Sequence, residues 1–174
     1  MGLDAVKAAI RDVPDFPKPG IIFKDITPIL QSPALFADVV DMLCAPYADS
    51  PPDRIAAIES RGFIFGAAMA YKLGCGLVPV RKAGKLPYDT KSESYELEYG
   101  EATLEIHVDA LEKGERVVIV DDLLATGGTA AATVKLVEGL GAEIAGVDFV
   151  IELAFLNGVE RLDGLNVRAL ITVD

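Results

Sequence analysis

The stretch RVVIVDDLLATGGTA, residues 116–130, decides the fold of this chain and poses its main functional question. The apolar run VVIV predicts a buried strand, which stops at two acids, Asp121 and Asp122. A Thr-Gly-Gly-Thr turn, of the kind that holds anions, follows a few residues later. Because two carboxylates would weaken a plain phosphate site by charge repulsion, their place beside this turn needs an explanation.

The turn itself has the features of a phosphate site. Gly127 and Gly128 allow positive φ angles and a close approach of the backbone to a ligand. The amides of residues 126–129 open a helix predicted for residues 129–140, so the N–H groups and the helix dipole point at the loop. Thr126 and Thr129 add hydroxyl donors. The turn is neither a Walker loop, since no Lys follows the glycines, nor a G-x-G-x-x-G dinucleotide fingerprint.

A sugar phosphate explains the two acids. Carboxylates accept hydrogen bonds from vicinal ribose hydroxyls, and they stabilise the positive charge that develops on the ring during glycosyl transfer. The alternative is that Asp122 only caps a helix and that the glycines form an ordinary loop. A lone GGT would favour this alternative, whereas an apolar strand that ends in two acids favours the sugar-phosphate site.

The rest of the chain alternates strands with helices, which predicts a single α/β domain, residues 1–174, with a mainly parallel sheet flanked by helices. We expect strands over residues 54–59, 76–81, 116–121, 144–153 and 166–173, and helices over residues 3–13, 33–49, 62–73 and 129–140. The alternation in YELEYGEATLEIHV, residues 95–108, predicts a hairpin. The polar segments ESRG, RKAGK, DDLLATGG and IEL follow four strands and should meet at one edge of the sheet.

Composition and charge exclude several classes of function. The net charge of −11 argues against a nucleic-acid partner, and it requires a phosphate site to build its own positive potential. The apolar stretch 62–71 is too short to span a bilayer, and the N-terminus does not resemble a signal peptide.

Cys44 and Cys75 are interpreted as small buried residues of a reducing, cytoplasmic compartment. His107, the only histidine, offers no triad or metal set and is expected to be structural or exposed.

The segment VVIVDDLLATGGT, residues 117–129, resembles the phosphoribosyl pyrophosphate (PRPP) motif of the type I phosphoribosyltransferases. Four further segments carry the resemblance over nearly the whole chain: VPDFPKPGIIFKDITPIL (13–30), ESRGFIFGAAMA (59–70), RKAGKLP (81–87) and YELEYG (95–100). The first and last of these four are specific to the adenine branch of the family. The resemblance implies the type I fold, with a small N-terminal hood over residues 1–31 and a flexible catalytic loop over residues 82–100.

The same resemblance implies an activity and its partners. Adenine would attack the anomeric carbon of PRPP, giving AMP and pyrophosphate in purine salvage. Mg²⁺ would be carried by the substrate, with no protein metal site. A homodimer is implied, with the apolar helix 62–71 and the N-terminal segment as candidate interfaces. Two alternatives stay open: a phosphoribosyltransferase for another purine, and a PRPP-sensing regulator, which the absence of an added helix-turn-helix and of a basic stripe disfavours.

Site residues are carried over by motif. The ribose-phosphate site comprises Asp121, Asp122, Leu123, Ala125, Thr126, Gly127, Gly128 and Thr129. The pyrophosphate site comprises Arg61, Arg81, Lys82, Lys85 and Tyr99, whose cations would neutralise the leaving group. The adenine site comprises Ile22, Phe23, Lys24 and Leu153, with Phe23 stacked on the purine.

Two of these assignments depend on the resemblance alone. Glu98 would act as general acid or base near the purine, although alternation alone makes it an exposed hairpin residue. Phe23 would read equally well as a core residue. The resemblance also predicts a cis peptide bond between Glu59 and Ser60. The chain departs from many relatives at Lys24, where Arg is common, at Glu59, where Asp is common, and in the stretch LPYDTKSES, which puts contacts from Tyr88 and Thr90 in doubt.

Overall fold

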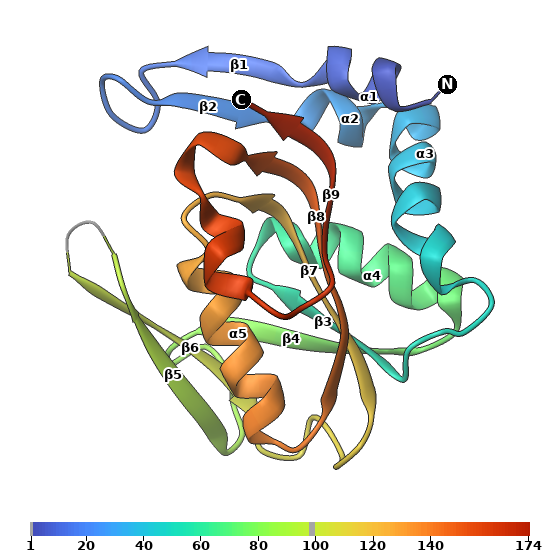
Figure 1. The fold of residues 1–174 in the computed structure, drawn as a ribbon, viewed down its shortest axis with the longest axis vertical. Coiled ribbons are helices and arrows are strands. Elements are labelled where there is room, and N and C mark those ends of the chain that lie inside the picture. Colours follow the sequence, from blue (N-terminus) through green and yellow to red (C-terminus); the bar gives the residue numbers. More distant parts are fainter. Residues whose placement is uncertain (1, 98–99) are drawn as a thin grey trace.

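The computed structural model of the chain describes residues 2–97 and 100–174 and shows one sheet covered by helices on both faces (Figure 1). The helices are α1 (Leu3–Ala9), α2 (Thr27–Gln31), α3 (Pro33–Cys44), α4 (Arg61–Leu73) and α5 (Gly128–Gly139), with short 3₁₀ turns η1 (Ala45–Tyr47), η2 (Ala154–Leu156) and η3 (Gly158–Leu162). The strands are β1 (Arg11–Pro14), β2 (Ile22–Asp25), β3 (Arg54–Ile58), β4 (Gly76–Lys82), β5 (Thr90–Glu96), β6 (Glu101–His107), β7 (Arg116–Leu124), β8 (Glu143–Leu153) and β9 (Val167–Val173). The predicted site residues Glu98 and Tyr99 lie outside the described residues.

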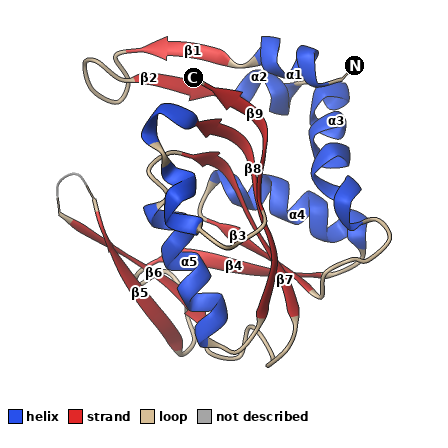
Figure 2. Cartoon of the chain, in the orientation of Figure 1, coloured by secondary structure: helices blue, strands red, loops and turns tan. Residues whose placement is uncertain are grey.

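Seven strands form the central sheet, in the order β5-β6-β4-β3-β7-β8-β9. The five strands from β4 to β9 in this order pair in parallel, and β5 and β6 join them antiparallel (Figure 2). The predicted mainly parallel sheet is therefore confirmed. Because the parallel strands share one direction, the polar segments that follow them meet at one sheet edge.

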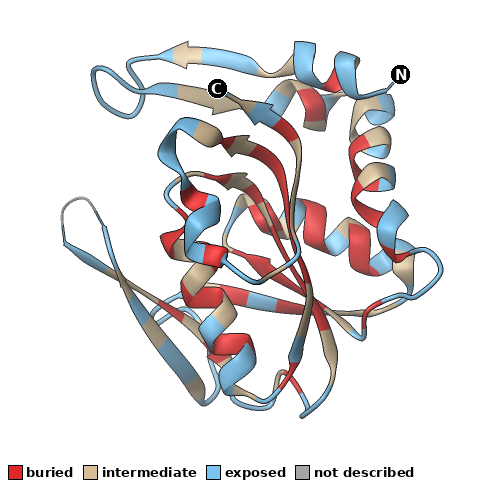
Figure 3. Cartoon of the chain, viewed as in Figure 1, coloured by how far each residue is buried: buried red, intermediate tan, exposed pale blue. Residues whose placement is uncertain are grey.

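The two sheet faces bury two separate hydrophobic clusters (Figure 3). Strand β3 shows why, since adjacent side chains of a strand point to opposite faces. Ile55 and Ala57 pack in the cluster that contains residues of α1–α4, whereas Ala56 and Ile58 pack in the cluster that contains residues of α5. This double burial explains why the strands read as continuous apolar runs.

Local signals mark two helix ends. The Ser32 side chain accepts a hydrogen bond from the Leu35 amide at 3.3 Å, and Pro33 is the first residue of α3. Gly74 ends α4 in the left-handed region at φ 69°, and the Cys75 amide donates to the Ala70 carbonyl.

The N-terminal helix is shorter than predicted. It ends at Ala9 rather than at Val13, because Arg11–Pro14 pairs antiparallel with Ile22–Asp25 to form the β1–β2 hairpin. The sequence analysis predicted no strand or helix between residues 14 and 32, where the structure has the second strand of this hairpin and α2. Together the hairpin and α2 form the hood, which lies beside the C-terminal end of β9 in Figure 1.

The segment 82–100, for which the resemblance implied a flexible loop, includes strand residues. Lys82 still belongs to β4, and Thr90–Glu96 forms β5, so only residues 83–89 connect these two strands. The predicted hairpin of residues 95–108 is confirmed but is longer, and it is part of the main sheet. Strand β6 pairs with β4 at Arg81–Glu105 and Lys82–Leu104.

Candidate functional site: the carboxyl edge of β7

The acid pair lies within strand β7, which continues to Leu124 instead of ending at Asp121 as predicted. Asp122 is almost fully buried, and its Oδ2 lies 2.9 Å from Nε of Arg61 at the start of α4. Asp121 is half-buried and lines a pocket with the following loop. The two carboxylates therefore have different surroundings: one is held by a cation, and the other faces the pocket.

Both acids are harder to ionise than ordinary carboxyls. Burial and the negative charge of Asp122 raise the pKa of Asp121 well above its usual value, although the Asp122 amide donates to Asp121 Oδ1 at 2.8 Å. Burial also raises the pKa of Asp122, against the opposing effect of the Arg61 charge. A positive charge that entered the pocket would relieve this repulsion.

The predicted phosphate loop forms one wall of that pocket. The residues that line it are Asp121, Leu123, Leu124, Ala125, Thr126, Gly127, Gly128, Thr129, Ala130 and Phe149. All predicted ribose-phosphate residues except Asp122 are in this set. The loop leads directly into α5, which begins at Gly128, so the amides at the helix start border the pocket.

Glycine is required at position 127 for two reasons. Its φ is 82°, in the left-handed region, and a Cβ there would lie 2.3 Å from the carbonyl oxygen of Gly158. Gly158 is held equally closely, because its own Cβ would lie 2.2 Å from the Ala125 carbonyl oxygen. The loop is thus pressed against η3, which the sequence analysis did not assign to the site. Its only signal was the Asn-Gly pair at residues 157 and 158.

Tyr95 is a second residue that the sequence analysis missed. The Thr129 hydroxyl donates to the Tyr95 hydroxyl at 3.1 Å. A Cβ on Gly128 would lie 3.0 Å from Cδ2 of the same ring. Its sequence signal, an aromatic residue in an alternating strand, indicates burial but gives no partner.

Two of the predicted cations, Arg81 of β4 and Lys85 of the following connection, gather around Glu59, whose side chain is buried. Arg81 Nε lies 3.4 Å from Glu59 Oε2, Lys85 Nζ forms a short ion pair with Oε1, and the Lys82 amide donates to Oε2 at 2.8 Å. Burial disfavours the ionised Glu59, but the hydrogen bonds from Lys85 and Lys82 outweigh it and lower the pKa of the carboxyl. Glu59 therefore anchors these cations at the end of β4.

The turn between β3 and α4 joins the cations to the acids. The peptide bond between Glu59 and Ser60 is cis, as predicted. Gly62 permits the close approach of this turn to β7, because a Cβ there would lie 2.9 Å from both Asp121 Oδ1 and the Val120 carbonyl oxygen.

The hood brings one aromatic side chain to this edge. The Arg61 guanidinium lies 4.9 Å from the centre of the Phe23 ring, and Phe16 meets the same ring edge-on at 5.1 Å. Phe23 is half-buried rather than a fully enclosed core residue. A chain of contacts therefore runs from Phe23 through Arg61 to Asp122.

The other predicted adenine residues have different environments. Ile22 is 56% exposed on β2, and Lys24 forms an ion pair of 2.7 Å with Asp12 of β1. Leu153, at the end of β8, packs in the same hydrophobic cluster as Ile26 and Ile29 of the hood segment.

Three further features of the described residues bear on the sequence predictions. Across residues 2–97 and 100–174, no group of three or more His, Cys, Asp or Glu side chains is arranged to hold a metal ion. Within the same ranges, none of the helices is both long and apolar enough to cross a membrane. His107 is half-buried, and its ring meets Tyr88 edge-on at 6.0 Å, which agrees with a structural role.

Comparison with known proteins gives consistent matches over this chain. The phosphoribosyl transferase domain family matches residues 25–158. The chain is 58% identical to the adenine phosphoribosyltransferase of Carboxydothermus hydrogenoformans, over 95% of this chain and 98% of that relative.

Solved structures of similar proteins agree with the sequence matches. The adenine phosphoribosyltransferase from Thermoanaerobacter pseudethanolicus superimposes with a TM-score of 0.96 at 54% identity, over 99% of this chain and 100% of that one. The enzyme from Saccharomyces cerevisiae, crystallised with adenine and an imino-altritol bisphosphate, gives a TM-score of 0.92 at 44% identity, over 97% of each chain.

Proposed function

The chain belongs to the phosphoribosyltransferase family, among the adenine phosphoribosyltransferases, and from this premise we propose that it transfers the 5-phosphoribosyl group of PRPP to adenine. The products are AMP and pyrophosphate, and the enzyme is a pentosyltransferase of purine salvage. Its type I phosphoribosyltransferase fold agrees with the predicted fold class. The observation that carries the assignment is the pocket at the end of β7, where one wall is the phosphate loop and the other includes Asp121.

The loop binds the 5-phosphate in this proposal. The amides at the start of α5 and the hydroxyls of Thr126 and Thr129 supply donors for the phosphate oxygens. Leu123 and Ala125 shape the pocket, and Gly127 and Gly128 let the backbone approach the ligand.

The acid pair holds the ribose and stabilises its cation. Asp121 and the phosphate loop line the same pocket, so the Asp121 carboxylate can accept hydrogen bonds from the ribose hydroxyls while the loop holds the phosphate. Asp122, fixed by Arg61, adds negative potential near the ring. Both carboxylates lower the energy of the oxocarbenium-like transition state more than that of the neutral ground state, which is the condition for catalysis.

Pyrophosphate leaves toward the cations. Arg81, Lys82 and Lys85 lie at the end of β4, beside the Glu59 turn, and Arg61 has further guanidinium N–H groups besides the Nε that meets Asp122. Positive charge here offsets the net charge of −11, which would otherwise repel PRPP. The assignment of Tyr99 to this site remains part of the proposal.

Among the residues that line the pocket, Asp121 is the carboxylate that would face a Mg²⁺ ion carried by PRPP, an ion that needs few protein ligands. When bound, the ion would neutralise charge on the leaving pyrophosphate.

Adenine lies against Phe23, with Ile22 and Lys24 beside it on β2 and Leu153 as the opposite wall. The half-buried Phe23 ring supports this position, since a stacking surface must be reachable. A backbone carbonyl that faces the 6-amino group would accept its hydrogen bond, whereas the 6-oxo group of hypoxanthine would leave that carbonyl unpaired.

Glu98 is the proposed general acid or base for the purine proton. The segment of residues 82–100, which includes strand β5, is the proposed catalytic segment that limits hydrolysis when it covers the site.

A homodimer in the cytoplasm completes the proposal. Ile64 and Tyr71 lie two turns apart on one side of α4, and their side chains are 39% and 90% exposed. An exposed aromatic and aliphatic surface of this kind fits burial against a second copy. Cys44 and Cys75 are both free thiols, which fits a reducing compartment.

The deciding experiment is a product assay. The enzyme, PRPP and Mg²⁺ are incubated with adenine, hypoxanthine or xanthine, and nucleotide formation is measured. We expect AMP from adenine and little product from the 6-oxo purines. Efficient use of hypoxanthine would favour the alternative purine specificity, and PRPP binding without any nucleotide product would favour a regulator.

A further inference from the structure

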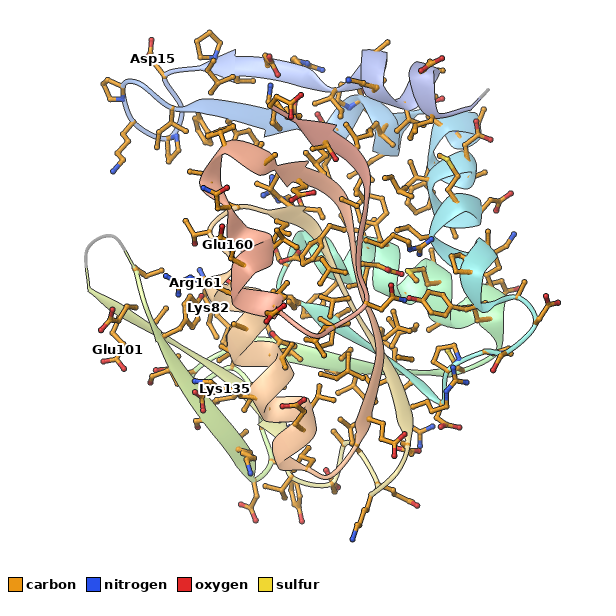
Figure 4. All side chains as sticks on the ribbon, viewed as in Figure 1. Asp15, Lys82, Glu101, Lys135, Glu160 and Arg161 are labelled. Carbon is orange, nitrogen blue, oxygen red and sulfur yellow. The ribbon has the colours of Figure 1, made fainter. Side chains whose placement is uncertain are left out.

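Strand β5 lies along α5 through one face of alternating side chains. Lys91 Nζ donates to the Gly139 carbonyl at 2.9 Å, at the C-terminal end of α5. Lys135 Nζ, which projects from the helix in Figure 4, pairs with Glu93 at 2.9 Å. Tyr95 then reaches the first turn of the helix. Because residues 91, 93 and 95 share one face of the strand, these contacts form one seam that ends at the phosphate loop.

Tyr95 makes two contacts at that end of the seam. Its ring packs on the Cα of Gly128, where a Cβ would lie 3.0 Å from ring carbon Cδ2, and its hydroxyl meets the Thr129 hydroxyl at 3.1 Å. Gly128 and Thr129 both line the pocket, and the ring of Tyr95 is half-buried. The phenol therefore contacts the phosphate loop from behind rather than from within the pocket lining.

We propose that Tyr95 is a positioning residue for the 5-phosphate, acting through the hydroxyl of Thr129. This inference rests on the proposed function, since it assigns the phosphate to this loop. In the structure the Thr129 hydroxyl donates to Tyr95, so it cannot donate to a ligand at the same time.

Phosphate binding would reverse this hydrogen bond. A hydroxyl rotates freely and carries one donor and two acceptor sites. When a phosphate oxygen accepts the proton of Thr129, the Tyr95 hydroxyl can turn and donate to Thr129 Oγ1. No bond is made or broken, and each hydroxyl keeps its own proton. The resulting chain from Tyr95 to Thr129 to phosphate strengthens the donor that faces the ligand.

This contact also couples two parts of the enzyme. Tyr95 belongs to the β5–β6 hairpin and Thr129 to α5, 34 residues later. The hairpin pairs with Arg81 and Lys82 of β4 on one side and lies along α5 through the seam on the other, so both contacts hold its orientation.

A double-mutant cycle tests the inference. Tyr95→Phe removes only the hydroxyl, and we expect KM for PRPP and Kd for AMP to rise about two- to tenfold, the range of one neutral hydrogen bond. The KM for adenine should stay within about twofold, because the purine lies elsewhere in the site. In a Thr129→Ala background, Tyr95→Phe should have no further effect on either constant.

Thr103→Val is the matched control. It removes another hydroxyl–hydroxyl contact of the same hairpin, the one of 2.8 Å between Ser94 and Thr103, without touching the phosphate loop. This variant should leave KM for PRPP within about twofold of the wild type. Any general loosening of the hairpin would appear in both Thr103→Val and Tyr95→Phe, and it would also change the melting temperature.

Two results would overturn the inference. One is an unchanged KM for PRPP in Tyr95→Phe. The other is an equal loss on adding Tyr95→Phe to the wild type and to Thr129→Ala, because additive effects exclude coupling through Thr129. The same cycle measured by calorimetry with ribose 5-phosphate needs no turnover. A wild-type enzyme that binds ribose 5-phosphate but forms no AMP would contradict the proposed function. The binding constants of the double-mutant cycle could still be measured and would still test the inference.

Discussion

Replacing Gly127 with Ala should disrupt the phosphate loop, and the effect on activity should be far larger than that of the same replacement at a glycine with open space around it. The added methyl would lie 2.3 Å from the Gly158 carbonyl oxygen, about 1 Å short of an ordinary contact. The obstacle is backbone and cannot rotate away. The left-handed φ of 82° adds a further cost of about 1–2 kcal/mol for any residue with a Cβ.

Gly114 provides a matched control with nearly the same positive φ. Its φ is 83°, and a Cβ there would meet nothing within 4 Å. Gly114→Ala should therefore cost only the conformational term, about 1–2 kcal/mol of unfolding free energy. Gly127→Ala should add about 1–3 kcal/mol of overpacking, unless the loop moves to relieve it.

Movement of the loop converts this strain into lost activity. A displacement of about 1 Å in a positioning element can lower the rate about 10²-fold. We therefore expect Gly127→Ala to lower kcat/KM for PRPP by about this factor, with Gly114→Ala unchanged within about twofold. Urea unfolding and steady-state kinetics measure both effects. If Gly127→Ala kept the PRPP kinetics of Gly114→Ala, the proposed contact between the loop and η3 would not position the phosphate.

Three further variants or conditions test other parts of the site. Phe23→Ala should raise the KM for adenine, since loss of one stacking contact costs about 1–3 kcal/mol. The KM for PRPP should stay nearly unchanged. If only the KM for PRPP changed, the purine would bind elsewhere. Glu98→Ala should lower kcat about 10²–10⁴-fold with little change in PRPP affinity, and near-normal turnover would refute its role. The raised pKa values of Asp121 and Asp122 predict that kcat/KM for PRPP falls with decreasing pH sooner than ordinary carboxyls would allow, because the pair must be ionised. Their contribution to stability changes the other way: a pKa raised on folding favours the folded state at low pH, and this contribution is lost as pH rises through the folded values. Asp121→Asn should flatten both profiles, and a wild-type rate that stays constant down to about pH 4 would contradict the prediction.

Much of the fold could be read from neighbouring residues. The apolar runs of β3, β7 and β8 identified buried strands, Ser32 and Gly74 marked helix ends, and the glycines after β7 marked the phosphate loop. These features depend on burial periodicity and on hydrogen bonds between residues a few positions apart. Short stretches of sequence are therefore enough to predict these strands, helix ends and the loop. The roles of individual residues came from the resemblance to a family.

The polar strands were harder to predict, because their partners lie far along the chain. Arg11–Pro14 continues a helical pattern, yet it forms β1 by pairing with Ile22–Asp25. Thr90–Glu96 is polar and resembles a loop in sequence, yet it forms a strand because it pairs with β6 and its side chains contact α5. For such exposed segments tertiary pairing outweighs weak local propensity.

The contacts within the site were decided by the tertiary structure alone. The sequence assigned Arg61 to pyrophosphate and Asp122 to the ribose, and it did not show that the two side chains meet at 2.9 Å. It likewise gave no sign that Tyr95 touches Thr129 or that Gly127 presses on Gly158. Each of these pairs joins different elements, and their distances follow from the order and twist of the strands. Local sequence determines which groups are present, whereas the packing of the sheet determines which of them meet.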